Sequence, residues 1–387
     1  MQAINVRTFM RRLPCRFPWL AVLRFGVCLV SPGAAVSQTP IPVQTNTTIR
    51  VMAANITTGN NQRYEAPGLR IFKALKPDVI AVQEFNYAST NGAGISTPGA
   101  IREMIDSAFG TDFVYFRESG TGYSIPNGII SRWPIRNSGT WDDVQVPDRG
   151  FAWAQIDIPG TNDLYVVSVH LHSSGGSSSR STEAANLRSL IQSTFPSGSF
   201  TVVAGDLNTD SRNEAAVTIL KTFLSDAAVP TDQSGDPDTN LSRAKPYDYV
   251  MPSYNLASNQ TATLITTNRF PSGLVFDSRT YPPLFDSQTV LTNDSSSVNM
   301  QHMAVVKDFQ IRHTITNLVE VPAPKLTLVS PGVLHWIGLS QLTYSVQTNR
   351  SLNNWHTAGS ATSTTTNFWF TNSVPAGDAN FYRVRFP

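Results

Sequence analysis

The sequence predicts a mixed α/β domain of roughly 270 residues, followed by a small all-β domain. In the first part, β-branched and aromatic runs alternate with segments whose apolar residues recur at helical spacing. A stiff stretch containing Pro322 and Pro324 then precedes a C-terminal region that has no helical period. A chain of 387 residues has room for both parts, since one domain takes about 150 residues.

Nine runs in the first part are typical of strands, because they are short, apolar and rich in β-branched or aromatic residues. They are 49–54, 79–82, 113–116, 128–130, 151–158, 164–170, 201–204, 247–251 and 303–309. Helical spacing occurs at 64–75, 98–109, 181–194 and 212–224, with a Lys-Pro pair ending the first helix and Gly110 the second. Some strands follow one another directly and others are joined through helices. This order indicates mixed sheets covered by helices, and it excludes a simple doubly wound parallel sheet.

The C-terminal region is predicted to be a small β-sandwich. Its short runs lie at hairpin spacing and are rich in Trp, Phe and Tyr: 326–329, 334–337, 343–348, 367–370 and 381–386. We interpret Trp336, Trp355 and Trp369 as core aromatics, with a carbohydrate platform as the alternative. The C-terminal segment, with 344–347, Trp355 and the closing 381–385, is similar to β-rich tails of secreted bacterial proteins. This similarity implies a binding or surface-attachment protein as a second class of function.

The first 37 residues have the features of a secretory signal peptide. Their only charged residues are arginines, and an apolar stretch from Phe17 to Val30 precedes small residues that end at Ser37. We expect a secreted or periplasmic protein cut after Ser37, with 38–48 as a spacer; an uncleaved anchor is the alternative. No other segment approaches the roughly 20 apolar residues of a membrane span. Both cysteines, Cys15 and Cys28, lie in this leader, so disulfides and thiolate metal ligands are excluded from the mature chain.

The charge of the chain changes sign once the leader is set aside. Removing its five arginines from the net charge of +2 leaves −3. A mildly acidic mature chain lacks the overall basic character of a protein that holds nucleic acid by charge alone. Any contacts to a polyanion would therefore have to be local.

Polar residues follow several predicted strands at the point where each apolar run ends. Asp206 and Asn208 are two residues apart after one such run, and His170 and His172 stand in the same relation, so each pair points one way if extended. Other polar residues beside strands are Asn55, Glu84, Asp248 and His302. Each has a structural alternative when taken alone, such as a helix cap or a hydrogen-bonded core histidine. Together they offer oxygen and imidazole ligands but no sulfur, which suits Mg²⁺ or Mn²⁺ better than zinc.

These motifs, taken in order, resemble the endonuclease/exonuclease/phosphatase superfamily, which includes deoxyribonuclease I, repair nucleases, sphingomyelinases and inositol polyphosphate 5-phosphatases. The matching pieces are Asn55, Gln83-Glu84, Gly128-Ile129-Ile130-Ser131-Arg132, His170-Leu171, Gly205-Asp206-Leu207-Asn208, Asp248-Tyr249 and His302. The resemblance implies a deoxyribonuclease I-like four-layer α/β/β/α sandwich with the site at one edge of both sheets. The predicted catalytic domain is then 49–312, the linker 313–325 and the small β-sandwich domain 326–387.

The resemblance also implies which residues hold the metal and activate the water. Glu84, with Asn55 beside it, would bind a divalent cation, Mg²⁺ or Mn²⁺, that neutralises phosphate charge. Asp206 would orient and deprotonate the attacking water. Asn208 would position that water or a phosphate oxygen.

The remaining implied roles concern the phosphate oxygens and the leaving group. His170 and His302 would bond the non-bridging oxygens, with one of them protonating the leaving group. Asp248 would fix the tautomer of His302. Tyr123 is interpreted either as a phosphate contact or as a surface tyrosine.

Gln301 departs from the family pattern, which usually has an aspartate before the last histidine. Its carbonyl oxygen can bind a metal, so Gln301 is counted among the predicted metal ligands, but it brings no negative charge. We therefore expect weaker metal binding, or one metal site rather than two, and Gln301→Asp would tighten metal dependence. A non-catalytic binding member of the superfamily is the alternative that this residue leaves open.

The predicted function is that of a secreted, divalent-metal-dependent phosphoesterase that hydrolyses phosphodiester bonds. A nuclease is the first interpretation, with local basic contacts from Arg149, Arg180, Arg212, Arg243 and Lys245. A sphingomyelinase-like enzyme, or another phosphatase or phosphodiesterase, is the alternative, although no clear apolar hairpin for a membrane is found. The loops 86–98 and 228–246 are candidate rims, and their polarity favours a soluble substrate. We expect a monomer.

Overall fold

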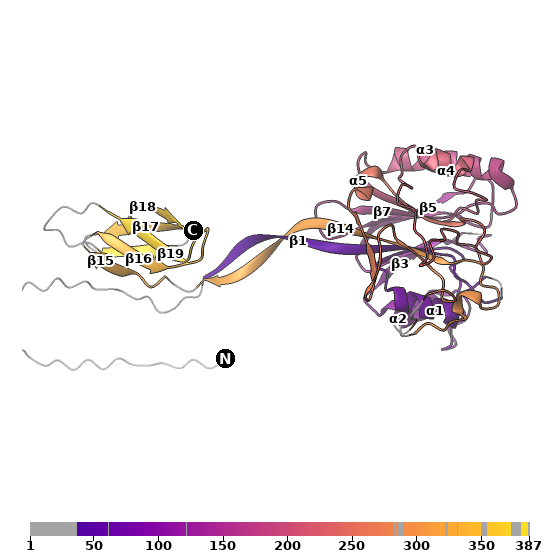
Figure 1. Ribbon diagram of the computed structural model, residues 1–387, viewed down its shortest axis with the longest axis horizontal. Coiled ribbons are helices and arrows are strands. Elements are labelled where there is room, and N and C mark those ends of the chain that lie inside the picture. Colours follow the sequence, from indigo (N-terminus) through magenta and orange to yellow (C-terminus); the bar gives the residue numbers. More distant parts are fainter. Residues whose placement is uncertain are drawn as a thin grey trace, which may run out of the picture. The chain divides into compact units, whose positions relative to one another are not determined.

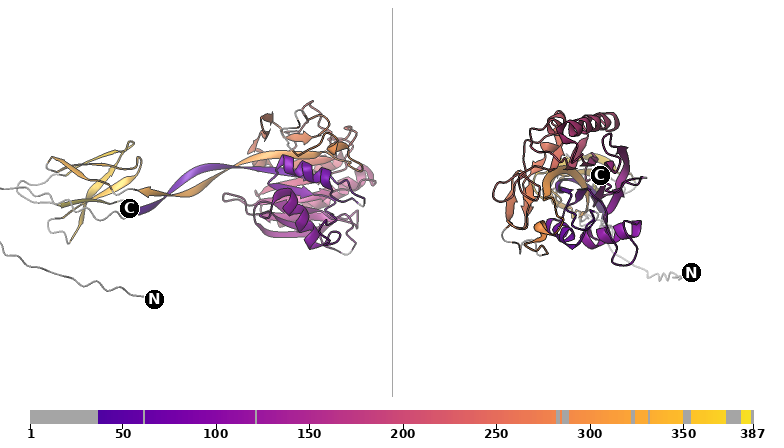
Figure 2. Two further views of the ribbon diagram at one scale, coloured as in Figure 1. Left: turned by 90° about the horizontal axis from the view of Figure 1, so that it is seen from below. Right: turned by 90° about the vertical axis from the view of Figure 1, so that its right-hand side faces the viewer.

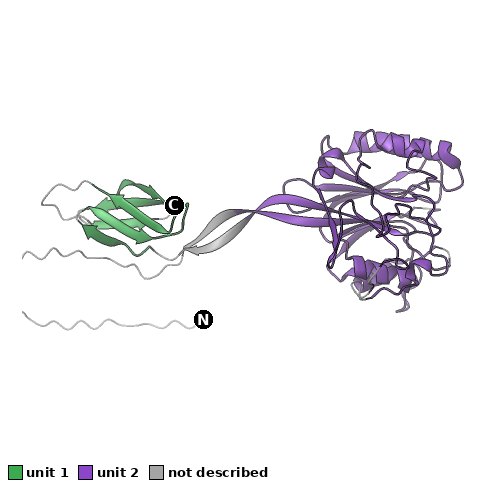
Figure 3. Ribbon diagram, in the orientation of Figure 1, with its two compact units in different colours: residues 1–42, 316–387 green, residues 43–315 purple. Residues whose placement is uncertain are grey.

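The computed structural model (Figure 1) describes residues 37–385, with the exception of 61, 121, 282–283, 285–288, 322–323, 331, 350–353 and 373–380. Apart from Ser37, the predicted signal peptide therefore lies outside the described residues. Residues 43–315 form one compact unit, and residues 316–387 belong to a second (Figure 3). Among the described residues, no helix is long and apolar enough to cross a membrane.

The first unit is built on two β-sheets. One sheet has the order β10-β14-β1-β2-β4-β3, with β13 also paired to β14. Its strands are β1 (Ser37–Ala54), β2 (Val79–Val82), β3 (Val114–Arg117), β4 (Gly128–Ser131), β10 (Gln260–Thr261), β13 (Leu274–Phe276) and β14 (Ala304–Val321). The other sheet has the order β5-β6-β7-β8-β9. Its strands are β5 (Ile135–Asp142), β6 (Gly150–Ile156), β7 (Leu164–His170), β8 (Phe200–Asp206) and β9 (Asp248–Pro252).

Helices cover the outer face of each sheet (Figures 1 and 2). The first sheet carries α1 (Ala66–Leu75) and α2 (Pro98–Phe109), and the second carries α3 (Gly176–Thr194) and α4 (Ala215–Leu220). Shorter elements are α5 (Tyr254–Ala257), the hairpin β11 (Thr263–Ile265) and β12 (Asn268–Phe270), and the 3₁₀ turn η2 (Asp294–Ser296). The arrangement confirms the predicted four-layer α/β/β/α sandwich.

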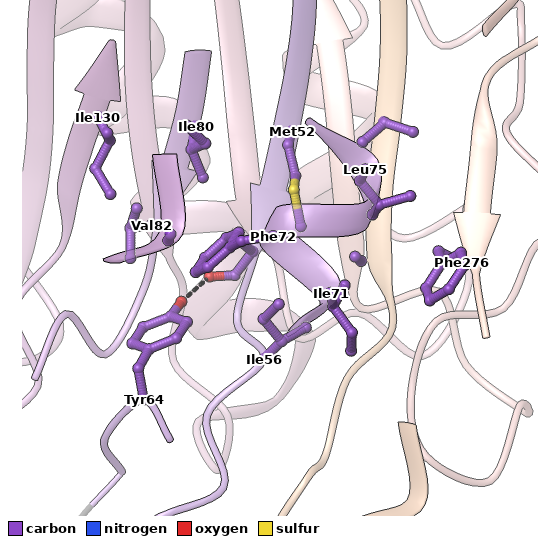
Figure 4. Packing of buried hydrophobic residues seen from close by; sticks show 14 of the residues in the cluster. Met52, Ile56, Tyr64, Ile71, Phe72, Leu75, Ile80, Val82, Ile130 and Phe276 are labelled. Carbon is purple, nitrogen blue, oxygen red and sulfur yellow. Dashed lines mark hydrogen bonds between the residues drawn. The ribbon is translucent and has the colours of Figure 1, made fainter. Parts of the chain in front are cut away.

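Three layers of apolar side chains hold these four layers together. In the first outer layer, Phe72 and Leu75 of α1 pack with Met52 of β1 and Ile80 of β2 (Figure 4). The middle layer lies between the sheets, and α3 and α4 cover the last. Every residue of β2 is buried because both faces of this strand are covered, which explains why 79–82 is apolar throughout.

Strand register brings the ends of several strands to one edge. In the first sheet, β1 and β2 are parallel, with Ala54 opposite Val82. In the second sheet, β7 and β8 are parallel and β9 is antiparallel, so His170, Asp206 and Asp248 lie side by side. The polar residues that follow these apolar runs therefore meet at one edge of both sheets.

A polar bridge joins the two sheets just beneath this edge. Gln83 Nε2 donates to Ser168 Oγ at 2.8 Å, and Ser168 Oγ donates to the carbonyl oxygen of Val82 at 2.8 Å. Gly205 lies against the same bridge with φ = 136°. A Cβ atom at Gly205 would stand 2.2 Å from the carbonyl oxygen of Val169 and 2.5 Å from Gln83 Nε2. Only glycine fits at this position.

We expect Gly205→Ala to lower the free energy of unfolding by about 3 kcal/mol or more. Both the backbone of Val169 and the side chain of Gln83 would have to move to make room for the added methyl group. Gly198→Ala is the matched control, since Gly198 also has positive φ (76°) but a Cβ atom there would meet nothing within 4 Å. The control should lose only about 1 kcal/mol. Urea unfolding measures both, and equal losses would show that positive φ alone decides the effect.

The structure corrects the predicted spacer and linker. β1 begins at Ser37 and β14 runs to Val321, so the described parts of 38–48 and much of 313–325 are strand. Gln44 Nε2 donates to Thr314 Oγ1 at 2.6 Å, and Thr47 Oγ1 lies 2.8 Å from His313 Nε2. The two segments are rich in Thr, Val and Ile, which favour extended strands. They lie in β1 and β14, which are neighbours in the sheet, so each strand extends along the other.

The second unit is all-β, as predicted. One sheet contains β15 (Thr327–Ser330), β16 (Val333–Ile337) and β19 (Asn367–Thr371), and the other contains β17 (Thr343–Asn349), β18 (His356–Thr362) and β20 (Phe381–Arg385). The buried residues shared by the two sheets are Leu334, Trp336, Tyr344, Val346 and Phe368. Trp336 is fully buried and stacks on Phe368, whereas Trp369 is exposed. The core interpretation therefore holds for Trp336 but not for Trp369.

Candidate active site

The edge shared by the two sheets carries a buried polar cluster. The first sheet supplies Asn55, which follows β1, and Glu84, which follows β2. The second sheet supplies His170 at the end of β7, Asp206 at the end of β8 and Asp248 at the start of β9. The predicted residues that the structure brings together here are Asn55, Glu84, His170, Asp206, Asn208, Asp248 and His302, and all are buried.

Asp206 is the centre of this cluster. Its Oδ2 atom accepts hydrogen bonds from Asn55 Nδ2 and Asn208 Nδ2, both at 3.1 Å. The same oxygen lies 3.4 Å from His170 Nε2 and 3.5 Å from His302 Nε2. Burial raises the pKa of Asp206 to about 7, and the charge of His302 opposes that rise. A carboxylate with such a pKa is suited to accept a proton near neutral pH.

Asn208 fixes the carboxylate of Asp206 through a strained turn. Its backbone adopts φ = 51°, in the left-handed region, and its amide nitrogen donates to Asp206 Oδ1 at 2.8 Å. Its Nδ2 also donates to the carbonyl oxygen of Leu171 at 2.9 Å. Asn tolerates left-handed backbone better than most residues, which fits its use here.

His302 is held in one orientation by Asp248. Its Nδ1 atom lies 2.9 Å from Asp248 Oδ2, so that Nε2 faces Asp206. Burial alone would lower the pKa of His302, but the carboxylates of Asp248 and Asp206 outweigh it and raise the pKa to about 10. A neighbouring carboxylate thus both fixes the ring and stabilises its charged form.

His170 has the opposite character. Burial, followed by the charges of Arg149 and His302, lowers the pKa of His170 well below its ordinary value. Arg149 is itself buried, and its Nε atom donates to the carbonyl oxygen of His170 at 2.6 Å. The site therefore combines one neutral and one charged imidazole around a single carboxylate.

Glu84 and Asn55 present oxygen atoms that fit a divalent cation. Glu84 has φ = 51°, a conformation unfavourable for this residue, and Thr57 Oγ1 donates to its carboxylate. Burial raises the pKa of Glu84, while Thr57, His302 and Asn55 oppose the rise. Within the described part of the chain, Asn55 Oδ1 is buried and has no hydrogen-bond partner. A hard cation takes such carbonyl and carboxylate oxygens as ligands.

A second possible ligand group is less suited to a cation. Asp206, Asp248 and His302 offer atoms that lie within 4.8 Å of one another. A histidine must be neutral to bind a metal, whereas His302 has a raised pKa and already faces both carboxylates. The donor chemistry therefore favours Asn55 and Glu84 for the cation.

Gln301 does not join this cluster, which corrects its prediction as a metal ligand. Its side chain is exposed, and its backbone carbonyl oxygen accepts a hydrogen bond from the backbone amide of Leu241 at 2.8 Å. Successive side chains of an extended segment point to opposite sides, so the buried side chain of His302 turns that of Gln301 outward.

We expect Gln301→Asp to shift the Mg²⁺ concentration for half-maximal activity by less than about twofold, because this side chain lies outside the cluster. Glu84→Gln keeps the size of the side chain but removes its negative charge, and this variant should raise that concentration by about tenfold or more. The measurement is a Mg²⁺ titration of hydrolysis for both variants and the parent. A clear tightening by Gln301→Asp would restore Gln301 to the metal site.

Two further predicted residues are placed elsewhere. His172 lies 3.1 Å from the hydroxyl oxygens of both Ser174 and Ser179, because the chain turns after β7 ends at His170. Tyr123 donates its hydroxyl to Asp142 Oδ1 at 2.9 Å and is not tied to the cluster.

Sequence reasoning missed Thr57 and Tyr247. Thr57 follows Asn55 by two residues, a spacing that places both on one side of an extended segment and could have indicated it. The ring of Tyr247 lies 5.6 Å from that of His302, and its neighbour Asp248 was the only local signal.

The basic residues expected to contact a polyanion are already engaged. Arg149 bonds backbone carbonyls, as described above. The other four form ion pairs with carboxylates: Arg180 with Glu214 (2.6 Å), Arg212 with Asp226 (2.7 Å), Arg243 with Asp277 (3.1 Å) and Lys245 with Asp210 (2.6 Å). These cations therefore do not form a free basic track.

Comparison with known proteins gives one family match. A model of the Endonuclease/Exonuclease/phosphatase family matches residues 69–273, more than half of the chain. The matched range contains Glu84, His170, Asp206 and Asp248, while Asn55 and His302 lie outside it. No curated protein matches the chain.

Several solved structures are similar to the chain at low identity. An endonuclease/exonuclease/phosphatase from Beutenbergia cavernae is 16% identical, with 87% of this chain and 100% of that chain covered and a TM-score of 0.44. A humanized D. rerio TDP2 is 17% identical, with 68% and 98% covered and a TM-score of 0.42. Sphingomyelinase C from Streptomyces griseocarneus is 14% identical, with 68% and 99% covered and a TM-score of 0.40.

Proposed function

Because the chain belongs to the endonuclease/exonuclease/phosphatase family, a family of metal-dependent phosphoesterases, we propose that it hydrolyses phosphodiester bonds at the Asp206 cluster. The observation that carries the proposal is Asp206 itself. Its Oδ2 atom is buried among amide and imidazole donors, between a candidate cation site and two histidines. This arrangement pairs a proton acceptor with groups that stabilise negative charge.

Hydrolysis requires a bond from a water oxygen to phosphorus while the bond from phosphorus to the leaving oxygen breaks. Asp206 takes the proton of the water at Oδ2, and Asn208 holds that carboxylate in place. His170 hydrogen-bonds a non-bridging oxygen as a neutral imidazole. His302, held by Asp248, stabilises the charge that develops and supplies the proton that the leaving oxygen takes.

Asn55 and Glu84 would hold the divalent cation, Mg²⁺ or Mn²⁺. When bound, this cation neutralises phosphate charge as a Lewis acid. The unpartnered Oδ1 atom of Asn55 and the buried carboxylate of Glu84 support this assignment. Thr57, which donates to Glu84, would orient the carboxylate toward the ion.

The substrate is the second part of the proposal. A nuclease remains the first hypothesis because the sequence predicts an export leader, yet the ion-paired cations do not favour binding along a polyanion. We propose that the enzyme holds the scissile phosphate locally and that its KM for DNA depends weakly on salt. The predicted leader supports action outside the cytoplasm.

The test is a substrate panel with Mg²⁺ and with EDTA. Plasmid DNA, bis(p-nitrophenyl) phosphate, p-nitrophenyl phosphate and sphingomyelin vesicles distinguish nuclease, diesterase, monoesterase and lipid activities. Metal-dependent cleavage of any of the three diesters, namely plasmid DNA, bis(p-nitrophenyl) phosphate or sphingomyelin, supports the proposal, and the diester that is cleaved fastest identifies the substrate class. Cleavage of the monoester alone would make the enzyme a phosphatase, and a folded chain inactive on all four substrates would favour a binding protein.

A further inference from the structure

One face of the second unit presents an exposed aromatic ring. On the sheet of β15, β16 and β19, Thr327 lies opposite His335, which lies opposite Trp369, so the three form a row across the strands. Their neighbours along the strands alternate between this outer face and the core. Leu334 and Phe368 point into the core, whereas Trp369 is 57% exposed.

The ring of Trp369 is held in place although it faces solvent. Its centroid lies 4.4 Å from that of His335, and His335 Nε2 lies 3.2 Å from Asn367 Oδ1. A large side chain that is already fixed loses little conformational freedom when a ligand covers it. Contact with His335 therefore makes Trp369 better suited to bind a ligand than an exposed Trp without such a contact.

Hydrogen-bonding groups surround the ring, and none of them is charged. Asn367 and Thr371 stand two residues to either side of Trp369 on β19, so all three share its face. The strands β15, β16 and β19 contain no Lys, Arg, Asp or Glu, and the same face also carries Ser330, Val333 and Ile337. The other sheet of this unit, by contrast, carries Arg383 and Arg385 on β20.

We propose that this face, defined by Thr327, His335, Asn367, Trp369 and Thr371, binds a neutral polysaccharide. A sugar ring has an apolar face of C–H groups, which packs on an aromatic ring, and a rim of hydroxyls, which exchange hydrogen bonds with hydroxyl and amide groups. A Trp ringed by Thr, Asn and His matches both parts. The absence of charged residues in β15, β16 and β19 matches a neutral chain and disfavours nucleic acid, which requires cations.

Binding to this face would keep the hydrolase near a polysaccharide surface. The face belongs to the unit that contains residues 316–387, whereas the Asp206 cluster belongs to the unit of residues 43–315. Loss of polysaccharide binding should therefore leave kcat on a soluble diester unchanged. This separation lets the two functions be tested independently.

The test is retention of the full chain on cellulose, chitin and curdlan, three insoluble neutral polysaccharides. We expect retention on at least one, with a loss of about tenfold or more in affinity for Trp369→Ala and a smaller loss for His335→Ala. Trp355→Ala is the matched control, because Trp355 lies beneath Arg383, 4.3 Å away, and away from the proposed row. This control should bind like the parent, and circular dichroism checks that each variant is folded.

Several outcomes would overturn the proposal. Failure to bind any of the three polysaccharides, or equal binding by Trp369→Ala and the parent, would remove it. A parent that self-associates in gel filtration, and becomes a monomer with Trp369→Ala, would make the face a contact between copies. Retention on heparin or DNA alone, lost in salt, would assign binding to the arginines of β20.

Discussion

Replacing Asp206 by asparagine is expected to lower kcat by about 10³-fold, because asparagine keeps the size of the side chain but cannot accept a proton from water. The effect should fall on kcat rather than on the metal requirement, since the charged ligand Glu84 is held by Thr57 and not by Asp206. The measurement is hydrolysis of bis(p-nitrophenyl) phosphate at saturating Mg²⁺, with urea unfolding to confirm the fold.

Asp210→Asn provides the control for Asp206→Asn. Asp210 is 64% exposed in its side chain and pairs with Lys245 on the surface. Its loss should change kcat by less than about twofold, because an exposed ion pair contributes little to the site or to stability. If Asp206→Asn kept more than about a tenth of the parent kcat, another group would have to activate the water.

Replacing Trp336 by alanine is expected to unfold the second unit. Removing a large buried aromatic residue lowers the free energy of unfolding by about 3–5 kcal/mol. The core of this unit is small: among its described residues, Trp336 is one of five buried residues that form the core. A loss of that size approaches the whole stability of a small domain.

The first unit should survive Trp336→Ala with its hydrolytic activity intact, because Trp336 lies outside residues 43–315. Differential scanning calorimetry should show one transition fewer than in the parent, while kcat on the soluble diester stays the same. Trp369→Ala, at the exposed surface, should leave both transitions in place. Loss of activity with Trp336→Ala would mean that the two units do not fold independently.

The apolar runs and the polar residues behind them could be predicted from the sequence for a physical reason. A strand buried on both faces, such as 79–82, must be continuously apolar, so its polar successor Glu84 stands out. The same logic located Asp206 at the end of β8 and Asp248 at the start of β9. Burial sets these patterns locally, so they can be read without knowing the neighbours in space.

The remaining features depend on contacts that sequence does not reveal. Arg243 could have faced a substrate, but carboxylates from residues 232, 236 and 277 reach it in the fold. Thr314 lies in β14, which neighbours β1, and its hydroxyl accepts a hydrogen bond from Gln44, 270 residues earlier in the chain. The outward turn of Gln301 follows from the inward turn of His302. Each case is decided by a partner remote in the chain.

The two halves of the cluster come from different sheets, and this has a consequence for finding its ligands. Asn55 and Glu84 belong to the first sheet, whereas His170, Asp206 and Asp248 belong to the second. A ligand that touches both halves can bind only while the sheets remain stacked, so it adds RT ln(1 + [L]/Kd) to the stability of the unit. Melting temperature therefore becomes a readout of occupancy that needs no turnover: cations, phosphate and substrate analogues can be ranked by the rise each produces.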